Sequence, residues 1–155
     1  MKLTAFTDYS LRVLIYLAAE PGRRATISEI ASSFAVSENH LTKVVHFLGK
    51  QGWLSTVRGK GGGLALALAA EAISVGQVVR DTEGAALPAE CFEPNGGHCA
   101  IARSCRLRGV LGEAVEAFYA VLDRYTLADL VRNPQAIVRL LNIPTAAAHA
   151  VQPRS

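Results

Sequence analysis

All three cysteines of the chain lie close together, in the segment CFEPNGGHCAIARSC at residues 91–105. Seven residues separate Cys91 from Cys99, and five separate Cys99 from Cys105. An iron–sulfur cluster needs soft thiolates several ångströms apart around its faces, and a glycine-bearing segment suits that arrangement. A structural zinc site normally has two close pairs of ligands, such as C-x-x-C, which this segment lacks. The spacing therefore favours a cluster held by three thiolates, with one ligand position left for another residue.

The same thiols allow two other kinds of chemistry. His98 offers a fourth ligand to zinc, although it is sterically awkward for it to bind the same ion as its neighbour Cys99. Oxidation of the cysteines would instead make a thiol-based redox regulator. A cysteine nucleophile is the least favoured interpretation, because no His or carboxylate accompanies a cysteine in a strand–turn–helix frame. We therefore do not expect an enzyme.

The positive charge of the chain is concentrated in its first half. Residues 1–80 carry nine Lys or Arg against five Asp or Glu, a balance of +4, whereas residues 81–155 carry seven against eight, a balance of −1. A polyanion would therefore meet the first half. The segment MKLTAFTDYS lacks the apolar run of a signal peptide, and LALALAA at 64–70 is too short to span a bilayer. We expect a cytoplasmic protein without membrane contact, in a reducing compartment where structural disulfides are rare.

Hydrophobic periodicity predicts three helices before the first strand. Apolar residues at helical spacing indicate a helix over residues 7–20, which ends at Pro21. A short second helix opens near Ser28, and Ser37 is then a good N-cap for a longer third helix. The inward face of this third helix is predicted to consist of Leu41, Val44, Val45 and Leu48.

The sequence period then changes to that of a β-hairpin. Residues 53–58 and 64–68 are typical of short strands, and the glycine-rich residues between them form a hairpin loop. A capping-box spacing at Ser74 opens a further helix. Residues 84–104 have no clear period, and a long helix with one apolar face follows over about 107–125.

Two helices joined by a tight turn and followed by a basic, glycine-rich hairpin are the layout of a winged helix-turn-helix, although this geometry also serves protein contacts. The second helix of such a pair enters the major groove with its polar first turns, and the wing meets phosphates or the minor groove. Trp53 is expected to pack in the core instead of stacking on bases. The residues predicted to contact DNA are Ser37, Asn39, His40, Thr42, Lys43, His46, Lys50, Arg58, Lys60 and Arg12.

The expected fold is mainly α with a small β-hairpin wing. Residues 1–80 are predicted to form the winged helix-turn-helix DNA-binding domain. Residues 81–142 are predicted to supply the cluster-binding loop and a long dimerisation helix, followed by a last short helix capped by Thr126. Residues 143–155 are predicted to form a disordered tail.

Four stretches of the sequence carry a resemblance to a known family. They are MKLTAFTDY at 1–9, NHLTKVVHFLGKQGWLSTVRGKGGGLAL at 39–66, the three cysteines ending in SCRLRGVL, and YTLADLV at 125–131. Through them the chain resembles the IscR/NsrR family of winged helix-turn-helix regulators, and within it the NsrR type of nitric-oxide-sensing iron–sulfur repressors. The resemblance covers nearly the whole chain up to about residue 142.

This resemblance implies a homodimer joined through the long helix, with each cluster held by Cys91, Cys99 and Cys105 of one subunit. It favours a [4Fe-4S] cluster over a [2Fe-2S] cluster. It also implies that the remaining ligand is a carboxylate, which matches Asp8 of the partner subunit. The IscR type has a His three residues after the third cysteine, where this sequence has Arg108. From the residues alone, Asp8 also suits a cap at the start of the first helix.

Together these expectations describe a transcriptional repressor. A symmetric dimer would bind a palindromic operator in double-stranded DNA, and the state of the cluster would set the spacing of the two recognition helices. Nitric oxide, which binds iron and displaces ligands, is the expected signal. A zinc- or thiol-based redox regulator, or a sensor of iron–sulfur status like the IscR type, is the alternative.

Overall fold

The computed structural model describes residues 2–59, 61–84, 89–93, 98–101 and 104–145. Its elements, in chain order, are α1 (Ala5–Ala19), α2 (Ile27–Phe34), α3 (Glu38–Lys50), β1 (Leu54–Val57), β2 (Gly63–Leu66), the 3-10 helix η1 (Ala70–Ala72), α4 (Val75–Glu83), the 3-10 helix η2 (Glu90–Phe92), α5 (Arg106–Leu122), α6 (Leu127–Leu130) and α7 (Pro134–Leu140). The predicted mainly helical fold with a hairpin wing is confirmed. None of the helices described is both long enough and apolar enough to cross a bilayer.

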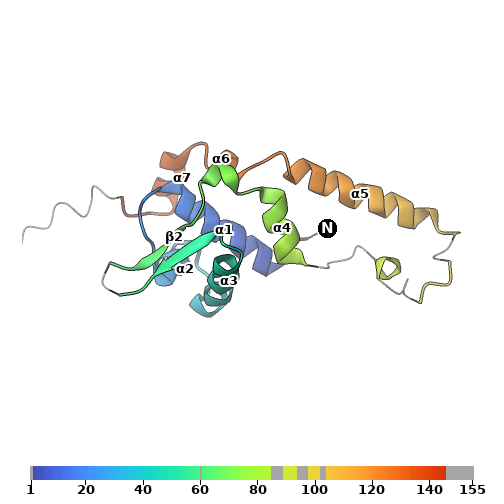
Figure 1. The fold of residues 1–155 in the computed structure, drawn as a ribbon, viewed down its shortest axis with the longest axis horizontal. Helices are drawn as coiled ribbons and strands as arrows, with labels where there is room; N and C mark the ends of the chain where they lie inside the picture. Colours follow the sequence, from blue (N-terminus) through green and yellow to red (C-terminus); the bar gives the residue numbers. More distant parts are fainter. Residues whose placement is uncertain (1, 60, 85–88, 94–97, 102–103, 146–155) are drawn as a thin grey trace, which may run out of the picture.

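The molecule has a packed body and one projecting helix (Figure 1). Helices α1 to α4, the β-hairpin, α6 and α7 form the body, which we call the winged body. Helix α5 extends away from it, and η2 lies near the far end of α5. The part of the chain predicted to bind DNA and the cysteine-bearing part therefore lie in different regions of the molecule.

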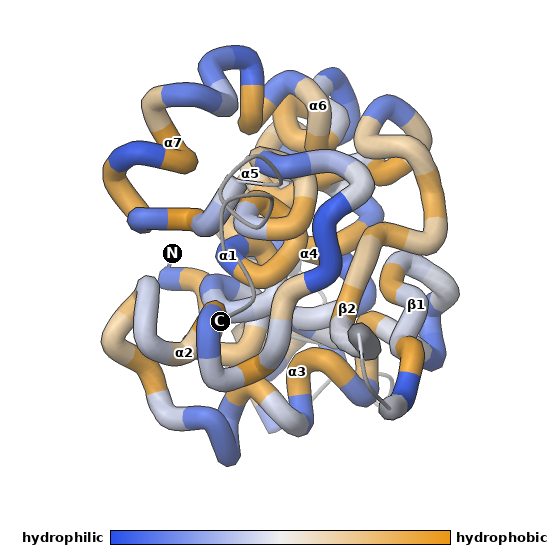
Figure 2. Tube along the Cα trace, turned by 90° about the vertical axis from the view of Figure 1, so that its left-hand side faces the viewer, coloured by the Kyte–Doolittle hydropathy of each residue, from blue (hydrophilic) through white to orange (hydrophobic). Residues whose placement is uncertain are grey.

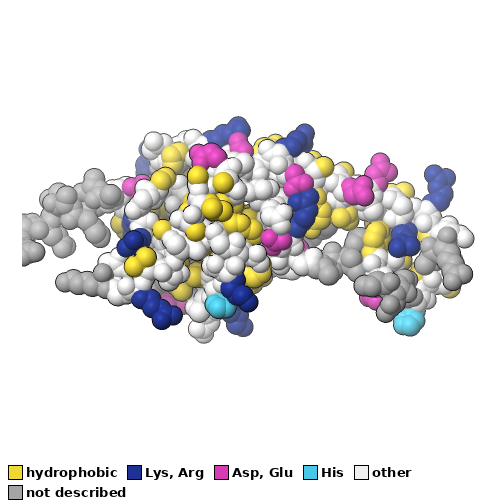
Figure 3. Space-filling model, viewed as in Figure 1, with side chains coloured by type: hydrophobic (Ala, Val, Ile, Leu, Met, Phe, Trp, Pro, Cys, Tyr) yellow, Lys and Arg dark blue, Asp and Glu magenta, His cyan; other side chains and the backbone are white. Residues whose placement is uncertain are grey.

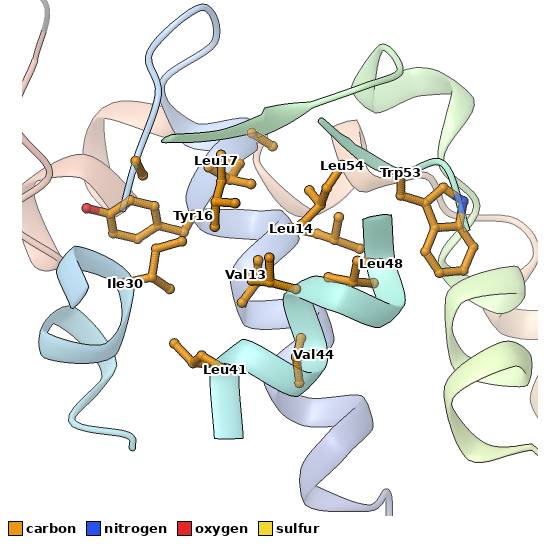
Figure 4. Close-up of a cluster of buried hydrophobic side chains, with 14 of the residues drawn as sticks. Val13, Leu14, Tyr16, Leu17, Ile30, Leu41, Val44, Leu48, Trp53 and Leu54 are labelled. Carbon is orange, nitrogen blue, oxygen red and sulfur yellow. The ribbon is translucent and has the colours of Figure 1, made fainter. Parts of the chain in front are cut away.

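Helix α1 is the centre of the winged body, and the other elements of the body surround it in Figure 2. Val13 and Leu14 of α1 are fully buried, as is Leu48 of α3. Figure 4 shows these side chains packed together with Leu54 of the wing. Because α1 contacts α3, α4, α6, α7 and β2, its burial extends around the helix and is not confined to one stripe.

A tight turn joins α2 to α3. Ala35 ends α2 in the left-handed conformation, with φ of 52°, and the next residue, Val36, donates its N–H to the Ala31 carbonyl at 3.0 Å. This bond satisfies a carbonyl at the end of α2, as helix-terminating motifs usually do. Ser37 then takes the N-cap position of α3, as the sequence predicts, but its side chain makes no capping hydrogen bond.

Helix α2 begins at a capping box formed by Thr26 and Glu29. The Glu29 N–H donates to Thr26 Oγ1 at 3.1 Å, and the Thr26 N–H donates to Glu29 Oε2 at 2.6 Å. Burial by itself raises the pKa of Glu29, but hydrogen bonds from Thr26 and Arg23 outweigh it and lower that pKa. The prediction that this helix opens near Ser28 is confirmed, with Ile27 as its first residue.

The wing is tied to the winged body through β2. Its strands pair antiparallel over Leu54–Val57 and Gly63–Leu66. Ala25, in the connection between α1 and α2, donates to the Leu64 carbonyl at 3.0 Å and accepts from the Leu64 N–H at 2.8 Å. Trp53, just before β1, is 8% exposed, so its predicted place in the core is confirmed.

Helix α5 is attached to the winged body at its carboxyl end. Arg80 of α4 donates to both carboxylate oxygens of Asp123, at 2.6 and 2.5 Å, and its guanidinium lies 4.6 Å from the Tyr119 ring centroid. A Cβ atom on Gly76 of α4 would come within 1.9 Å of Asp123 Oδ1, so α4 and this end of α5 approach closely. In the described part of the chain, no side chain of α5 itself is buried.

The predicted cap after α5 is confirmed. Thr126 and Asp129 form a capping box at the start of α6, where the Thr126 N–H donates to Asp129 Oδ2 at 2.8 Å. This backbone hydrogen bond, with those from the Arg132 and Thr126 side chains, lowers the pKa of Asp129 to about 2. The box fixes the direction in which the chain returns to the winged body.

Helix α7 was not expected from the sequence. Asn133 caps it through a hydrogen bond from the Ala136 N–H to Oδ1 at 3.2 Å, and Pro134 occupies its first turn. After α7, Ile143 is buried in the core of the winged body. The packed chain therefore continues past residue 142, where the tail was expected to begin, and residues 146–155 lie outside the described residues.

Candidate functional site

Helix α3 turns a continuous polar side to solvent. Its inward residues, which pack on α1, are all buried: Leu41, Val44, Val45 and Leu48. Because these recur at helical spacing, the intervening polar residues must face outward. The exposed side chains predicted to contact DNA are Ser37, Asn39, His40, Thr42, Lys43, His46 and Lys50. Figure 3 shows Lys, Arg and His side chains gathered at the lower edge of the winged body, near α3.

Two of these polar side chains are already oriented. The Thr42 hydroxyl donates to the Glu38 carbonyl at 2.8 Å, so towards a ligand it is available as an acceptor. The His40 ring stacks on Tyr9 of α1, with centroids 6.2 Å apart. The first turns of α3 therefore present partly fixed hydrogen-bonding groups, which favours selective contacts with base edges.

An open hollow lies between α3 and the wing. It is lined by His46 and Lys50 from α3 and by Thr56 and Arg58 from the wing, among others. Arg58 is exposed, as predicted, whereas Lys60 lies outside the described residues. Cationic side chains on both sides of one concave surface suit a phosphate backbone running between them.

Asp8 and Arg12 form an ion pair on α1. Arg12 Nε donates to Asp8 Oδ1 at 3.1 Å, and Arg12 Nη2 lies 2.8 Å from Asp8 Oδ2. The Arg12 guanidinium also lies 5.6 Å from the ring centroid of Phe34, the last residue of α2. Arg12 was predicted to contact a DNA phosphate, and in this structure its donors are directed at Asp8.

Thr4, and not Asp8, caps α1. The Thr7 N–H donates to Thr4 Oγ1 at 3.3 Å. The suggestion that Asp8 serves as this cap is therefore not realised in the structure, although Asp8 still lies in the first turn, where a negative charge is favourable. Its carboxylate is bonded to Arg12 and is partly exposed.

Glu83, at the end of α4, holds the start of α1, and sequence reasoning did not find it. It accepts hydrogen bonds from the Thr4 N–H at 2.8 Å and from the Thr4 hydroxyl at 3.1 Å. Burial by itself raises the pKa of Glu83, but hydrogen bonds from Thr7 and Thr4 outweigh it and lower that pKa. No local pattern could have indicated this contact, because its partners lie 79 positions apart in the sequence.

The three cysteines lie in different environments. Cys91 is buried in η2, Cys105 is partly buried as the N-cap residue of α5, and Cys99 is exposed. Next to Cys91, the Phe92 ring packs on α5: the Arg108 guanidinium lies 5.7 Å from its centroid, and a Cβ on Gly112 would contact its edge. The elements that carry Cys91 and Cys105 are therefore in contact.

The donor set fits an iron–sulfur cluster in chemistry but is not assembled in a single chain. The three thiols are unpaired, so none is used in a disulfide. Among the described residues, no three His, Cys, Asp or Glu side chains are grouped closely enough to hold a metal ion. Arg108, where the IscR type has a His, covers Phe92 and has no lone pair for a metal. Ligation would require closure of the segment and a donor from outside it.

Comparisons with known proteins agree on one family. Residues 3–133 match the Rrf2 family, whose members are described as iron-dependent transcriptional regulators. The HTH-type transcriptional regulator NsrR of Bacillus subtilis (strain 168) is 51% identical over 144 residues, which cover 92% of this chain and 99% of that protein.

Solved structures agree with the fold. The oxidized form of Staphylococcus aureus CymR is 29% identical, with a TM-score of 0.67 over 84% of this chain and 95% of that one. T. potens IscR is 23% identical, with a TM-score of 0.69 over 100% of this chain and 94% of that one. At the identity of the second pair, the likeness concerns the fold alone.

Proposed function

The chain belongs to the Rrf2 family of iron-dependent transcriptional regulators, and we propose that it is a dimeric repressor that senses nitric oxide through an iron–sulfur cluster. It is a DNA-binding regulator and not an enzyme. One observation supports the sensing role above all. The outward polar side of α3 and the wing belong to one region of the molecule, and the three unpaired thiols belong to another. Helices α4 and α5 connect the two regions.

Dimerisation through α5 is supported by its surface. Its side chains Leu107 and Val110 are 60% and 57% exposed, and Val121 is 44% exposed. A helix with an apolar side and no cover of its own normally packs against another element. A second copy of α5 would provide that cover, and the twofold symmetry of such a dimer would place two α3 helices against a palindromic operator.

We assign Cys91, Cys99, Cys105 and Asp8 of the partner subunit as the ligands of the cluster. We favour a [4Fe-4S] cluster over a [2Fe-2S] cluster. When bound, the cluster would supply iron at which nitric oxide can react. A carboxylate oxygen is a harder and weaker ligand for such iron than a thiolate. Asp8 is therefore the ligand that is released first.

The ion pair with Arg12 is compatible with this role of Asp8. Both side chains are about half exposed, at 46% for Asp8 and 41% for Arg12. An exposed pair of this kind stabilises by only about 0.2 to 1 kcal/mol. The ion pair therefore does not prevent Asp8 from reaching a partner subunit. After its release from a cluster, the Asp8 carboxylate could form the ion pair with Arg12 again.

Helix α4 supplies a path from Asp8 to the projecting helix. At the carboxyl end of α4, Glu83 binds Thr4 at the start of α1, and in the same last turn Arg80 binds Asp123 at the base of α5. A change at the start of α1 would thus act on the orientation of the winged body relative to α5. A coupling of about 1 to 3 kcal/mol changes affinity about 5- to 150-fold.

Anaerobic purification followed by a DNA-binding titration tests the proposal. We expect a brown protein that binds a duplex selected from a random library and loses both its visible absorbance and its selectivity after nitric oxide. Cys99→Ala should remove both properties, whereas Ser104→Ala, an exposed control in the same segment, should retain them. An iron-free protein with tight and selective binding would contradict the proposal.

The exposure of Cys99 supports a second candidate, a zinc- or thiol-based redox regulator. A sensor of iron–sulfur status like the IscR type would share the three cysteines with the main proposal, but that type has a His as its further ligand where this chain has Arg108. Metal analysis distinguishes the zinc- or thiol-based redox regulator from the main proposal, because a redox regulator of this kind would be a colourless protein with zinc or no metal. Titration with nitric oxide distinguishes the sensor of iron–sulfur status, because such a sensor would leave DNA when its cluster is lost and would show no particular sensitivity to nitric oxide.

A further inference from the structure

The residues described on either side of position 60, at the tip of the wing, are glycines. Gly59 and Gly61 have φ of 93° and 77°, which side-chain-bearing residues rarely adopt. The Gly62 N–H donates to the Gly59 carbonyl at 2.9 Å, and a Cβ on Gly62 would come within 2.2 Å of the Val57 carbonyl oxygen. The turn is therefore tight but built from glycine, which loses the most conformational freedom when ordered.

Arg24 reaches this tip from the connection between α1 and α2. Its Nη1 donates to the Gly61 carbonyl at 3.2 Å. The backbone beside it pairs with the start of β2, because Ala25 pairs with Leu64 and a Cβ on Gly63 would lie 3.1 Å from Arg24 Cβ. Residues 24 and 25 thus contact the wing at its tip and at the first residues of β2.

We infer that Arg24 is a positioning residue for DNA binding, which holds the wing tip where Arg58 can contact DNA. This inference rests on the proposed DNA-binding function. Arg24 is exposed and cationic, so a direct phosphate contact is the rival role. Its hydrogen bond to Gly61 favours the positioning role, since that bond directs the guanidinium along the wing. A guanidinium has five N–H donors in a planar fork, so Arg24 can donate to the Gly61 carbonyl without distortion of the backbone.

The first experiment uses the full-length protein without DNA. Backbone relaxation of the Gly61 and Gly62 amides is compared between wild type and Arg24→Ala by nuclear magnetic resonance. We expect lower order parameters at these glycines in the variant and unchanged values at Ser55 in β1. Unchanged order at the tip would overturn the positioning role.

The second experiment is a double-mutant cycle on the full-length protein, reconstituted anaerobically, with a fluorescent duplex selected from a random library. Arg24→Ala should weaken binding about 2- to 10-fold, the equivalent of one hydrogen bond. In an Arg58→Ala background it should change affinity by less than about 2-fold, because its effect passes through the wing. Equal effects in both backgrounds would show an independent phosphate contact and overturn the inference.

Arg139→Ala is the matched control for charge. Arg139 is exposed on α7 and donates to the Gln135 carbonyl of its own helix, so its loss removes the same charge without touching the wing. We expect its affinity to stay near that of wild type, and an equal loss in both variants would also overturn the positioning role. If wild type selects no duplex, the proposed function fails, while the relaxation experiment still decides whether Arg24 holds the wing.

Discussion

The winged body and the projecting part of the molecule are built on different principles. In the winged body, α1 is covered on several sides, and its core includes fully buried Val13 and Leu14. Along α5, by contrast, every described side chain keeps contact with solvent, and Cys99 is exposed. The region that would bind DNA is thus complete within one chain. In the proposed function, the region that would sense a signal would be covered by a second chain and would hold a ligand.

The largest expected effect tests the incompleteness of α5. Val110→Glu would place a carboxylate in the apolar side of α5, and an unpaired buried charge costs about 3 to 5 kcal/mol. We expect sedimentation equilibrium to show monomers with a folded winged body by circular dichroism. Glu116→Gln, on the polar side of α5, should leave the association unchanged. A variant that still forms dimers at wild-type affinity would place the interface elsewhere.

A slightly smaller effect tests the completeness of the winged body. Leu14→Ala should lower the free energy of unfolding by about 2 to 5 kcal/mol, because the side chain is fully buried at the centre of the core. Leu140→Ala, at a residue 80% exposed, should stay within about 0.5 kcal/mol of wild type. Urea denaturation measures both. Equal losses would mean that the core is not where the structure places it.

The next effect tests the junction of the two regions. In Gly76→Ala, the new Cβ would meet Asp123, so its carboxylate must move away from Arg80, and we expect a loss of about 1 to 3 kcal/mol in unfolding free energy. Gly109→Ala in α5 is the control, since nothing lies within 4 Å of its new Cβ. That change should stabilise the helix by about 0.5 to 1 kcal/mol. Thermal unfolding that shows the same sign for both would contradict a close junction.

The smallest effect concerns the cap that follows α5. The lowered pKa of Asp129 means that its ionised form stabilises the folded state above the ordinary pKa of 3.8, and that this contribution is lost as the pH falls through about 2. Asp129→Asn should therefore be less stable than wild type at neutral pH. The gap should narrow below about pH 4. Urea denaturation at several pH values tests this, and a constant gap would indicate that the cap does not depend on charge.

Much of the winged body could be predicted because its signals are local. The apolar spacing of α3 fixed its outward residues, and the glycines fixed the hairpin. The start of α2 was predicted near Ser28 and is observed at Ile27, whereas α7 was missed because its seven residues are too few for a clear pattern. The contacts of Glu83 with Thr4 and of Arg24 with Gly61 join distant parts of the chain, so only the fold reveals them.

The attachment of α5 at one end makes it a lever. Its 17 residues give a length of about 25 Å at roughly 1.5 Å per residue, so a tilt of about 10° at the base would swing the far end by roughly 4 Å. Cys105 lies at that far end, and Arg80 and Asp123 lie at the fulcrum. A small rotation of α5 at its contacts with α4 would therefore produce a larger displacement at the thiols. A displacement imposed at the thiols would in turn act on α4 as a small rotation with a large torque.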